Sequence, residues 1–393
     1  MNADRKLKLN IVVGGRFHSE QLYEAVSADG HDAHIYASSP VRYFKSVPSG
    51  AITFVPKPAQ IVQKVSGLRM PRWSSEYSSI AFDAIVSRIM RPADLVWGFN
   101  GDSQLCGQRI KARGGIYVVD RACPHFLAQE ILLMQESSAT GYPYAPQTRR
   151  VRERFLREYE IADLVVVPSA YSASSFPVHG ITADRIAIAP LDANAPLGAG
   201  QDAPRISFPG CAEGDILVGL VGGSFLRKGI LYLLRAVKLL NRRDIRIVMR
   251  ATESNVMQHA EARMLCEQLG VVFVPYLKDI NSFYRSLDMF VLPSVDEGFG
   301  MVLYEALRNG IPTIASSHVG AIDGMESGRD FIKVPARSAA HLADAIGRLA
   351  SNPSLRDRIG ANGQAFHKSR MAHGGQYQNA VSDILAILAK GGD

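Results

Sequence analysis

The chain has 393 residues, of which 47% are hydrophobic and 21% charged, with a formal net charge of +7. This length suits two domains with a core each, and the composition is that of a globular protein. No apolar run reaches the roughly 18 residues that a membrane span needs, and the N-terminus lacks the hydrophobic region of a signal peptide. We therefore expect a cytoplasmic protein. The modest charge is no specific sign of nucleic acid, since no motif of a nucleic-acid-binding fold appears.

The first half of the chain alternates strand-like and helix-like segments. Short apolar runs predict strands at 9–13, 34–36, 52–55, 95–97, 116–119 and 164–167, and a helical period follows the first strand at 20–26. Such alternation is typical of a parallel sheet covered on both faces. The basic run from Arg149 to Arg154, extended by Arg157, indicates a helix face, which is usually solvated.

A stretch rich in Ala, Pro, Gly and Asp over 192–209 predicts an interdomain linker. A second series of strands follows at 216–221, 245–249, 271–274, 289–292 and 313–315, and amphipathic helices are predicted at 231–240, 339–350, 354–369 and 376–389. We predict an α/β protein with two Rossmann-like domains, over 1–195 and 210–375. The alternation alone leaves other proteins with two such domains open.

Four cysteines, Cys106, Cys123, Cys211 and Cys266, are widely spaced and include no Cys-x-x-Cys. We interpret them as buried thiols rather than disulfides or a metal site.

Two basic residues follow the strand at 216–221, in the glycine-containing loop 222–229. This loop is not a P-loop, because Gly229 follows Lys228 where a Ser or Thr is required. Arg227 offers a planar donor fork and Lys228 a point charge, and together they suit a diphosphate. Such a pair can neutralise a departing diphosphate as a metal ion does elsewhere.

Two glutamates with seven residues between them are the most informative feature of the chain. Glu297 is placed on a loop after the strand at 289–292, and Glu305 in the second turn of the next helix. Glutamates are usually exposed, so the pair alone is weak evidence for a functional site. Gly298 and Gly300 strengthen the evidence for a site, because they let the backbone approach a ligand closely. They also precede the start of a helix, where the first amides are unpaired and favour an anion.

The run from Pro293 to Pro312 reads Pro-Ser-x-x-Glu-Gly-Phe-Gly-x-x-x-x-Glu-Ala-x-x-x-Gly-x-Pro. It resembles the signature of retaining GT-B glycosyltransferases related to glycogen synthase, glycosyltransferase family 4. The resemblance implies two Rossmann-like domains that face a central cleft, with a C-terminal helix near 376–393 that crosses back to the first domain. It also implies that the first domain takes an acceptor and the second a nucleotide-sugar donor.

The same resemblance assigns roles to the residues of the donor site. Glu297 would bind the hydroxyls of the donor sugar and Glu305 those of the ribose. Arg227 and Lys228 would stabilise the departing diphosphate, and His125 would contact the donor sugar and the reacting centre. The other implied donor-binding residues are Gly14, Gly15, Gly223, Tyr276, Leu277, Gly298, Phe299, Gly300, Met301 and Val302.

Some segments depart from the family pattern. Gly14 and Gly15 lack the full dinucleotide fingerprint, although Arg16 and His18 nearby are candidates for the acceptor side. Asp120 and Arg121, before His125, could orient it or bind the acceptor. The segment 316–324 keeps Gly320 but has Ala321 and Asp323 where the family has other residues.

The expected partners are a nucleotide-sugar donor and a glycan, lipid-linked or small-molecule acceptor. We expect no cofactor and no metal, in agreement with the absence of Asp-x-Asp. The net charge is compatible with peripheral contact at the inner membrane face. Two other functions stay open: a nucleotide-sugar epimerase or hydrolase of the same fold, and a non-catalytic protein that binds a nucleotide sugar or a glycan.

Overall fold

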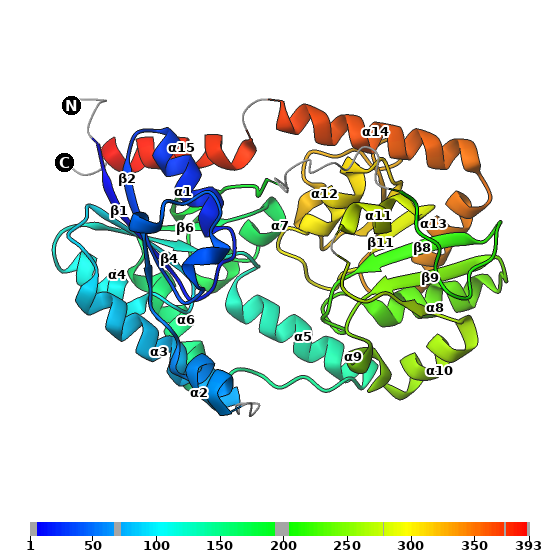
Figure 1. The fold of residues 1–393 in the computed structure, drawn as a ribbon, viewed down its shortest axis with the longest axis horizontal. Coiled ribbons are helices and arrows are strands. Elements are labelled where there is room, and N and C mark those ends of the chain that lie inside the picture. Colours follow the sequence, from blue (N-terminus) through cyan, green and yellow to red (C-terminus); the bar gives the residue numbers. More distant parts are fainter. Residues whose placement is uncertain (1–5, 67–71, 193–203, 278, 373–374, 391–393) are drawn as a thin grey trace.

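Two parallel β-sheets, each flanked by helices, lie side by side in the molecule (Figure 1). The computed structural model describes residues 6–66, 72–192, 204–277, 279–372 and 375–390. The first sheet has the order β3-β2-β1-β4-β5-β6-β7, and the second has the order β10-β9-β8-β11-β12-β13. The predicted α/β class with two Rossmann-like halves is confirmed.

The strands of the first sheet are β1 (Lys8–Val13), β2 (Asp32–Ala37), β3 (Ile52–Phe54), β4 (Leu95–Phe99), β5 (Ile116–Asp120), β6 (Leu164–Val167) and β7 (Ile186–Ile188). Its helices are α1 (Ser19–Ala28), α2 (Pro58–Ser66), α3 (Arg72–Ile89), α4 (Gln104–Lys111), α5 (Phe126–Thr140), α6 (Arg149–Ile161) and α7 (Ala170–Ala173).

The second sheet contains β8 (Ile216–Val221), β9 (Ile245–Arg250), β10 (Val272–Phe273), β11 (Met289–Leu292), β12 (Thr313–Ser316) and β13 (Ile332–Val334). The helices that follow or flank these strands are α8 (Ile230–Leu240), α9 (Glu253–Met257), α10 (Ala260–Leu269), α11 (Ile280–Arg285), α12 (Met301–Arg308), α13 (Ala339–Ala350), α14 (Pro353–Met371) and α15 (Gln376–Lys390).

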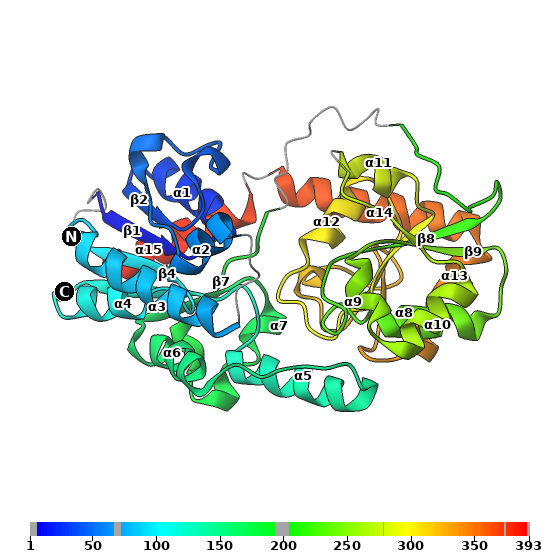
Figure 2. The ribbon, with the colours of Figure 1, turned by 60° about the horizontal axis from the view of Figure 1, so that its bottom comes forward.

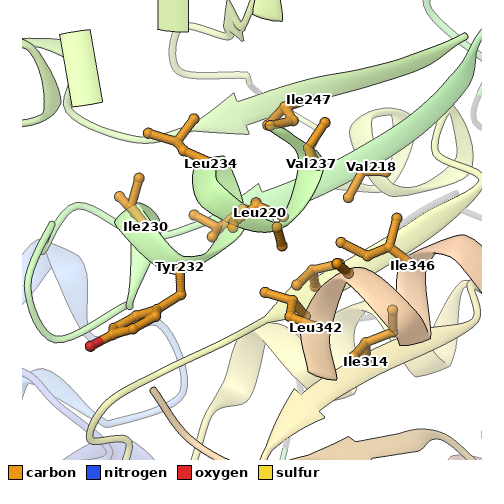
Figure 3. Packing of buried hydrophobic residues seen from close by; sticks show 14 of the residues in the cluster. Val218, Leu220, Ile230, Tyr232, Leu234, Val237, Ile247, Ile314, Leu342 and Ile346 are labelled. Carbon is orange, nitrogen blue, oxygen red and sulfur yellow. The ribbon is translucent and has the colours of Figure 1, made fainter. Parts of the chain in front are cut away.

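Each sheet is buried on both faces, which explains why its strands are continuous apolar runs. In β1, Ile11 and Val13 belong to one core cluster, and Val12 belongs to another on the opposite face. In the second domain, Val218 and Leu220 of β8 pack with Ile247, with Leu234 of α8 and with Ile346 of α13 (Figure 3). Side chains that alternate along a strand point to opposite faces, so each sheet supports two layers of helices.

The last helix, α15, returns to the first domain, as the GT-B resemblance implied. It packs on α1 (Figure 1). Its residues Tyr377, Val381, Ile384 and Leu385 enter the core cluster of β1 and β2. The predicted linker over 192–209 lies mostly outside the described residues, and the exact domain boundaries stay a prediction.

A second connection between the domains is helix α5, which reaches from the first sheet toward the second domain (Figure 2). Glu136 is 1% exposed, and its Oε2 accepts from Tyr232 Oη at 3.2 Å and from Arg337 Nε at 2.7 Å. After the helix ends, Tyr142 stacks on Phe225, with 4.5 Å between ring centroids. The two sheets are therefore joined by buried polar and aromatic contacts as well as by the chain.

Several sequence-based expectations need correction. The strands β7 and β13, of three residues each, were not predicted, and Lys333 interrupts the apolar pattern of β13. The basic face of α6 is not wholly solvated: Arg154 is 7% exposed, and its Nη2 pairs with Asp83 Oδ2 at 2.5 Å. Cys106 and Cys266 are buried as predicted, but Cys123 and Cys211 are only half-buried.

None of the helices in the described part of the chain is both long and apolar enough to span a bilayer.

Replacing Leu385 by Ala should destabilise the first domain. The side chain is 1% exposed, and truncating a buried Leu typically lowers the free energy of unfolding by ~2–5 kcal/mol. Ile387→Ala on the same helix is the matched control, because Ile387 is 68% exposed. Urea unfolding monitored by circular dichroism measures the unfolding midpoint of each variant. Equal midpoints for the two variants would contradict the packing of α15 on the first domain.

Candidate functional site

The candidate site lies where the strand order of the second sheet reverses. The chain runs from β8 to β9 on one side and from β11 to β12 on the other, although β8 and β11 are neighbours. The loops that follow β8 and β11 therefore diverge and leave a crevice, which is where ligands of open α/β sheets bind. Arg227 and Lys228 lie on the first loop and Glu297 on the second, so the fold brings these three predicted residues together.

Glu297 is shared by the two cations. Its Oε1 accepts from Arg227 Nη1 at 3.1 Å, and its Oε2 accepts from Lys228 Nζ at 2.5 Å. The side chains of Lys228 and Glu297 are only 7% and 11% exposed, whereas that of Arg227 is 29% exposed. Two cations and one carboxylate leave a net charge of +1 in a largely buried place, which favours a further anion.

The electrostatics of this triad follow from burial and pairing. Burial by itself raises the pKa of Glu297, but Lys228 and Arg227 outweigh it, so this pKa lies below its ordinary value. Burial also lowers the pKa of Lys228, against the opposing effect of Glu297. The carboxylate is thus held ionised between its partners.

The backbone around Glu297 is held as firmly as its side chain. Its N–H donates to His318 O at 3.0 Å, and its carbonyl accepts from Gly320 N at 3.0 Å. Three residues later, Gly300 adopts φ 108° as the N-cap of α12 and offers no side chain to cap the helix. The first amides of α12 are therefore available to a ligand, and helix N-termini favour anions.

A cleft of about 680 Å³ opens beside this triad, and both domains line it. The first domain contributes Arg16, Phe17, His18, Glu20, Gln21, Glu24, Lys45, Ser46 and Ala122, together with Leu191, which precedes the undescribed segment; the second domain contributes Lys228, Glu297, Phe299, Gly300, Met301 and Val302. Six of the predicted site residues thus share one wall. Opposite them lie Arg16 and His18, the two candidates for the acceptor side.

Gly298 is needed for contact between the domains. A Cβ at this position would lie 2.1 Å from the carbonyl oxygen of Ala122 in the first domain. The Gly298 carbonyl in turn accepts from Ser169 Oγ at 2.6 Å. We predicted this glycine as a place where the backbone approaches a ligand; the structure shows that it approaches the other domain.

Asp296 is a site residue that the sequence reasoning missed. It is 0% exposed, and its carboxylate accepts from Gln129 Nε2 at 2.5 Å and from Tyr171 Oη at 3.1 Å, both in the first domain. Burial raises the pKa of Asp296 above its ordinary value, and the contacts with Gln129, Arg227 and Tyr171 offset only part of this increase. No local signal could have found this contact, because its partners lie 167 and 125 residues away.

His125 does not reach the cleft, which contradicts its predicted role at the reacting centre. It is 2% exposed and stacks on His179 at 4.1 Å between centroids, with Tyr159 and Phe176 beside it. Its Nδ1 accepts from Leu127 N at 3.3 Å and so caps helix α5. Burial, with His179 and Arg121, lowers the pKa of His125 to about 3. The histidine is a neutral, packed cap.

Two of the predicted glycines are also placed differently from expectation. Gly14 N donates to Asp102 Oδ2 at 3.1 Å, and that carboxylate would meet any Cβ on Gly14. Gly223 is exposed, and its carbonyl accepts from Asn255 Nδ2 at 3.1 Å. Gly14 and Gly15 shape the loop that presents Arg16 to His18, but neither glycine lines the cleft itself.

The predicted residues for the ribose and the base lie beside the cleft rather than in its lining. Glu305 is half-buried in α12, and its Oε2 accepts from Tyr284 Oη at 2.7 Å. Tyr276 is 82% exposed beneath the guanidinium of Arg250, with 5.2 Å from its Cζ to the ring centroid. Leu277 packs against the core cluster of α11 and α12. Their proposed ligand contacts stay predictions.

The described residues contain no group of three or more His, Cys, Asp or Glu side chains placed to hold a metal ion. On one side the candidate site has Arg227, Lys228, the carboxylate of Glu297 beside that of Asp296, and a helix N-terminus, with a polar wall from the first domain opposite.

Comparison with known proteins agrees with this geometry. Residues 216–352 match the family model of glycosyl transferases group 1. The capsular polysaccharide biosynthesis glycosyltransferase CapM of Staphylococcus aureus is 29% identical over 38% of the chain and 40% of CapM. The lipopolysaccharide core biosynthesis glycosyltransferase LpsD of Rhizobium meliloti is 31% identical over 45% of the chain and 50% of LpsD. The chain thus spans half or less of these relatives.

Among solved structures, Anabaena HepE in complex with UDP and glucose superposes with a TM-score of 0.66 at 16% identity, over 98% of this chain and 100% of HepE. That likeness establishes the GT-B fold for the whole described molecule.

Replacing Gly298 by Ala should separate the two walls of the cleft. The added methyl group would meet the Ala122 carbonyl, and overpacking of this kind costs ~1–3 kcal/mol. We expect a larger radius of gyration in small-angle X-ray scattering and a lower melting temperature. Gly50→Ala is the control, because nothing lies within 4 Å of a Cβ built there; identical scattering for both variants would contradict the interdomain contact.

Proposed function

We propose that this chain, whose residues 216–352 match the family model of glycosyl transferases group 1, is a glycosyltransferase that moves a sugar from a nucleotide-diphosphate sugar to an acceptor hydroxyl. The observation that carries the proposal is the triad of Arg227, Lys228 and Glu297 at the switch point of the second sheet. It faces, across a cleft of about 680 Å³, a polar wall from the other domain.

The donor diphosphate would bind between the two cations and the start of α12. Lys228 Nζ and the guanidinium of Arg227 supply positive charge, and the amides of Met301 and Val302 lie on the same wall. These groups act where negative charge develops as the diphosphate leaves, so they lower the barrier to transfer. The diphosphate would share the cations with Glu297, which leaves the carboxylate oxygens able to accept hydrogen bonds from the donor sugar.

The nucleotide would extend from the diphosphate along α12. Glu305 lies one turn further along this helix, and Tyr284 orients its carboxylate. A carboxylate at that distance from the helix start suits the two ribose hydroxyls, because it can accept two hydrogen bonds. Structures of HepE are known in complex with UDP and with UDP-glucose, and we propose a nucleotide sugar of the same class for this chain.

The acceptor would enter from the first domain, where Arg16, Glu20 and Lys45 form the polar rim of the cleft. The family signature from Pro293 to Pro312 supports retention of configuration, so the acceptor would attack on the face from which the diphosphate leaves. A glycan, lipid-linked or small-molecule acceptor fits this cleft. Burial between the two domains would favour transfer over hydrolysis.

Glu297→Gln should abolish most transfer while keeping the nucleotide bound. The amide preserves the size of the side chain but removes the charge that holds the triad in place, and we expect a loss of ~100-fold or more in kcat/KM. Nucleotide diphosphates should still raise the melting temperature, because Arg227 and Lys228 lose a competing anion. The donor is first chosen by a melting screen of nucleotide sugars, and transfer is then measured as release of the nucleoside diphosphate.

Glu326→Gln is the matched control, since the Glu326 side chain is 66% exposed and outside the cleft. Unchanged transfer by Glu297→Gln would overturn the proposed function. Free sugar or an isomerised donor formed at full rate without any acceptor would instead favour a hydrolase or an epimerase.

Transfer should persist after metal removal. Arg227 and Lys228 are two cations placed to carry the charge that a divalent ion carries elsewhere. We expect the initial rate in excess EDTA to stay within about twofold of the rate in buffer, because these two residues would neutralise the charge of the departing diphosphate. A loss of rate that Mg²⁺ or Mn²⁺ restores would contradict metal-independent transfer.

A further inference from the structure

Phe17 is an exposed aromatic residue on the first-domain wall of the cleft. It lies in the loop between β1 and α1, lines the cleft, and is 66% exposed. A phenyl ring that stays in water forgoes the free energy that its burial would contribute to folding. Single exposed hydrophobic residues are nevertheless common on protein surfaces, so its exposure alone does not identify a site. Its backbone and its surroundings do.

The backbone of Phe17 is strained. Its φ of 41° lies in the left-handed region, which bulky residues rarely adopt because it costs free energy. Asn241 also has a positive φ, but it ends helix α8, where a left-handed residue is common. Phe17 ends no helix, so helix geometry does not account for its conformation. Strain of this kind is concentrated at functional sites.

The ring of Phe17 is held in place despite its exposure. It stacks on Phe99, with 5.8 Å between the ring centroids and 16° between the ring planes. Phe99 is 4% exposed at the end of β4, so it ties the ring of Phe17 to the core. The same ring also packs against Gly15, where a Cβ would come within 3.1 Å of Phe17 Cε2. Gly15, which does not itself line the cleft, therefore leaves room for this ring.

The side chains around Phe17 are polar. Among the described residues that line the cleft, Phe17 is the one apolar residue that is exposed. Glu20 Oε2 accepts from Arg16 Nη2 at 2.5 Å, and Glu20 Oε1 accepts from the N–H and the hydroxyl of Ser46, both at 2.7 Å. Arg16 and Ser46 therefore fix this carboxylate in the rim of the cleft.

Two charged side chains on the same wall are free to bind a ligand. Glu24 lies one turn after Glu20 on α1, and Lys45 precedes Ser46; both are exposed and line the cleft. Within the described part of the chain, neither of these two side chains forms a hydrogen bond or an ion pair. A carboxylate accepts hydrogen bonds and an ammonium group donates them, so together they suit the hydroxyl groups of a ligand.

One flat apolar surface among polar groups matches the chemistry of a pyranose ring. The C–H groups on one face of such a ring pack on the negative face of an aromatic side chain, while its hydroxyl groups point outward. An acyl chain would need a continuous apolar surface, which this polar wall does not provide.

We propose that Phe17 is the stacking surface for a pyranose ring of the acceptor, and that it selects sugars as acceptors; this inference rests on the proposed glycosyl transfer. Glu24 and Lys45 would bind hydroxyl groups of the stacked ring. Phe17 and Glu297 line the same cleft from different domains, so an acceptor sugar on Phe17 would face a donor sugar at Glu297.

The experiment compares acceptors that have a ring with one that has none. The wild-type chain, Phe17→Leu and Phe17→Trp receive the donor chosen by the melting screen, with methyl glycopyranosides of the common hexoses or with sorbitol. Sorbitol carries the hydroxyl groups of a hexose on an open chain. Acceptor-dependent release of the nucleoside diphosphate gives kcat/KM, saturation-transfer NMR in the presence of UDP reports binding of the methyl glycosides, and calorimetry gives the affinity for UDP.

Phe54→Leu is the matched control, because Phe54 is 43% exposed and lies outside the lining of the cleft. It makes the same change at another exposed phenylalanine of the first domain. We expect it to leave transfer and binding at the wild-type values.

We expect Phe17→Leu to lower kcat/KM for the methyl glycosides by ~3–10-fold, the size of one aromatic contact, because leucine is apolar but not flat. Sorbitol, donor hydrolysis and the affinity for UDP should be unaffected, and Phe17→Trp should keep the preference for a ring. Wild-type kcat/KM for the glycosides in Phe17→Leu would overturn the proposal. Equal losses with glycosides, sorbitol and water would overturn it too, since they would show that Phe17 only shapes the loop. A weaker affinity for UDP would place the nucleotide on Phe17 instead.

Octyl glycopyranosides in the same assay distinguish the two sources of such a ring. A lower KM for the octyl than for the methyl glycosides would assign the ring to a lipid-linked sugar. Equal KM values would assign it to a free glycan. In both cases Phe17→Leu should weaken the use of the glycoside, and its failure to do so would overturn the stacking surface.

Failure of the proposed function is distinguishable. In that case the wild-type chain would release sugar from no nucleotide sugar and transfer it to no acceptor. Methyl glycopyranosides would still bind in the NMR experiment, and Phe17→Leu would still weaken that binding. A wild-type chain that binds none of the methyl glycosides would overturn the stacking surface itself, whether or not the chain transfers sugar.

Discussion

The sharing of one carboxylate between two largely buried cations is the interaction on which the rest of the site depends. Lys228 and Arg227 lie in a place that water reaches poorly, and without Glu297 they would be two uncompensated charges close together. With it, these three side chains keep one excess positive charge and a defined geometry. A diphosphate bound there, as we propose, would meet cations that are already oriented, so little reorganisation would be needed when charge develops.

The position of Glu297 depends in turn on the other domain. The residue before it, Asp296, is held by Gln129 and Tyr171, and the residue after it, Gly298, is in backbone contact with Ala122. The loop with the donor carboxylate is thus fixed on both sides by the first domain. Any relative motion of the domains must disturb Glu297, which couples the geometry of the triad to the closure of the cleft.

The wall of the site that carries Glu297 could be placed from the sequence because its information is local. Glu297, Gly298, Gly300 and the start of α12 lie within a single loop and helix, and the spacing of their residue types reports their geometry directly. The fold class was also predictable, since strands buried on both faces are continuous apolar runs. The edge strand β7 was not predicted; its residues are half-buried or exposed, unlike those of the strands inside the sheet.

The first-domain wall of the cleft is harder to predict from the sequence because it is assembled from distant segments. His18 and Asp120 are 102 residues apart, and Asp296 meets Gln129 across 167 residues, so only the fold brings them together. The prediction for His125 failed for the same reason. A histidine just after a strand is equally compatible with a role in a site and with a structural role until its neighbours are known. Those neighbours are aromatic rings and a helix start, which keep it neutral and buried. His18 is also largely buried, but it lines the cleft and pairs with Asp120, so the two histidines differ in tertiary contacts that the sequence does not show.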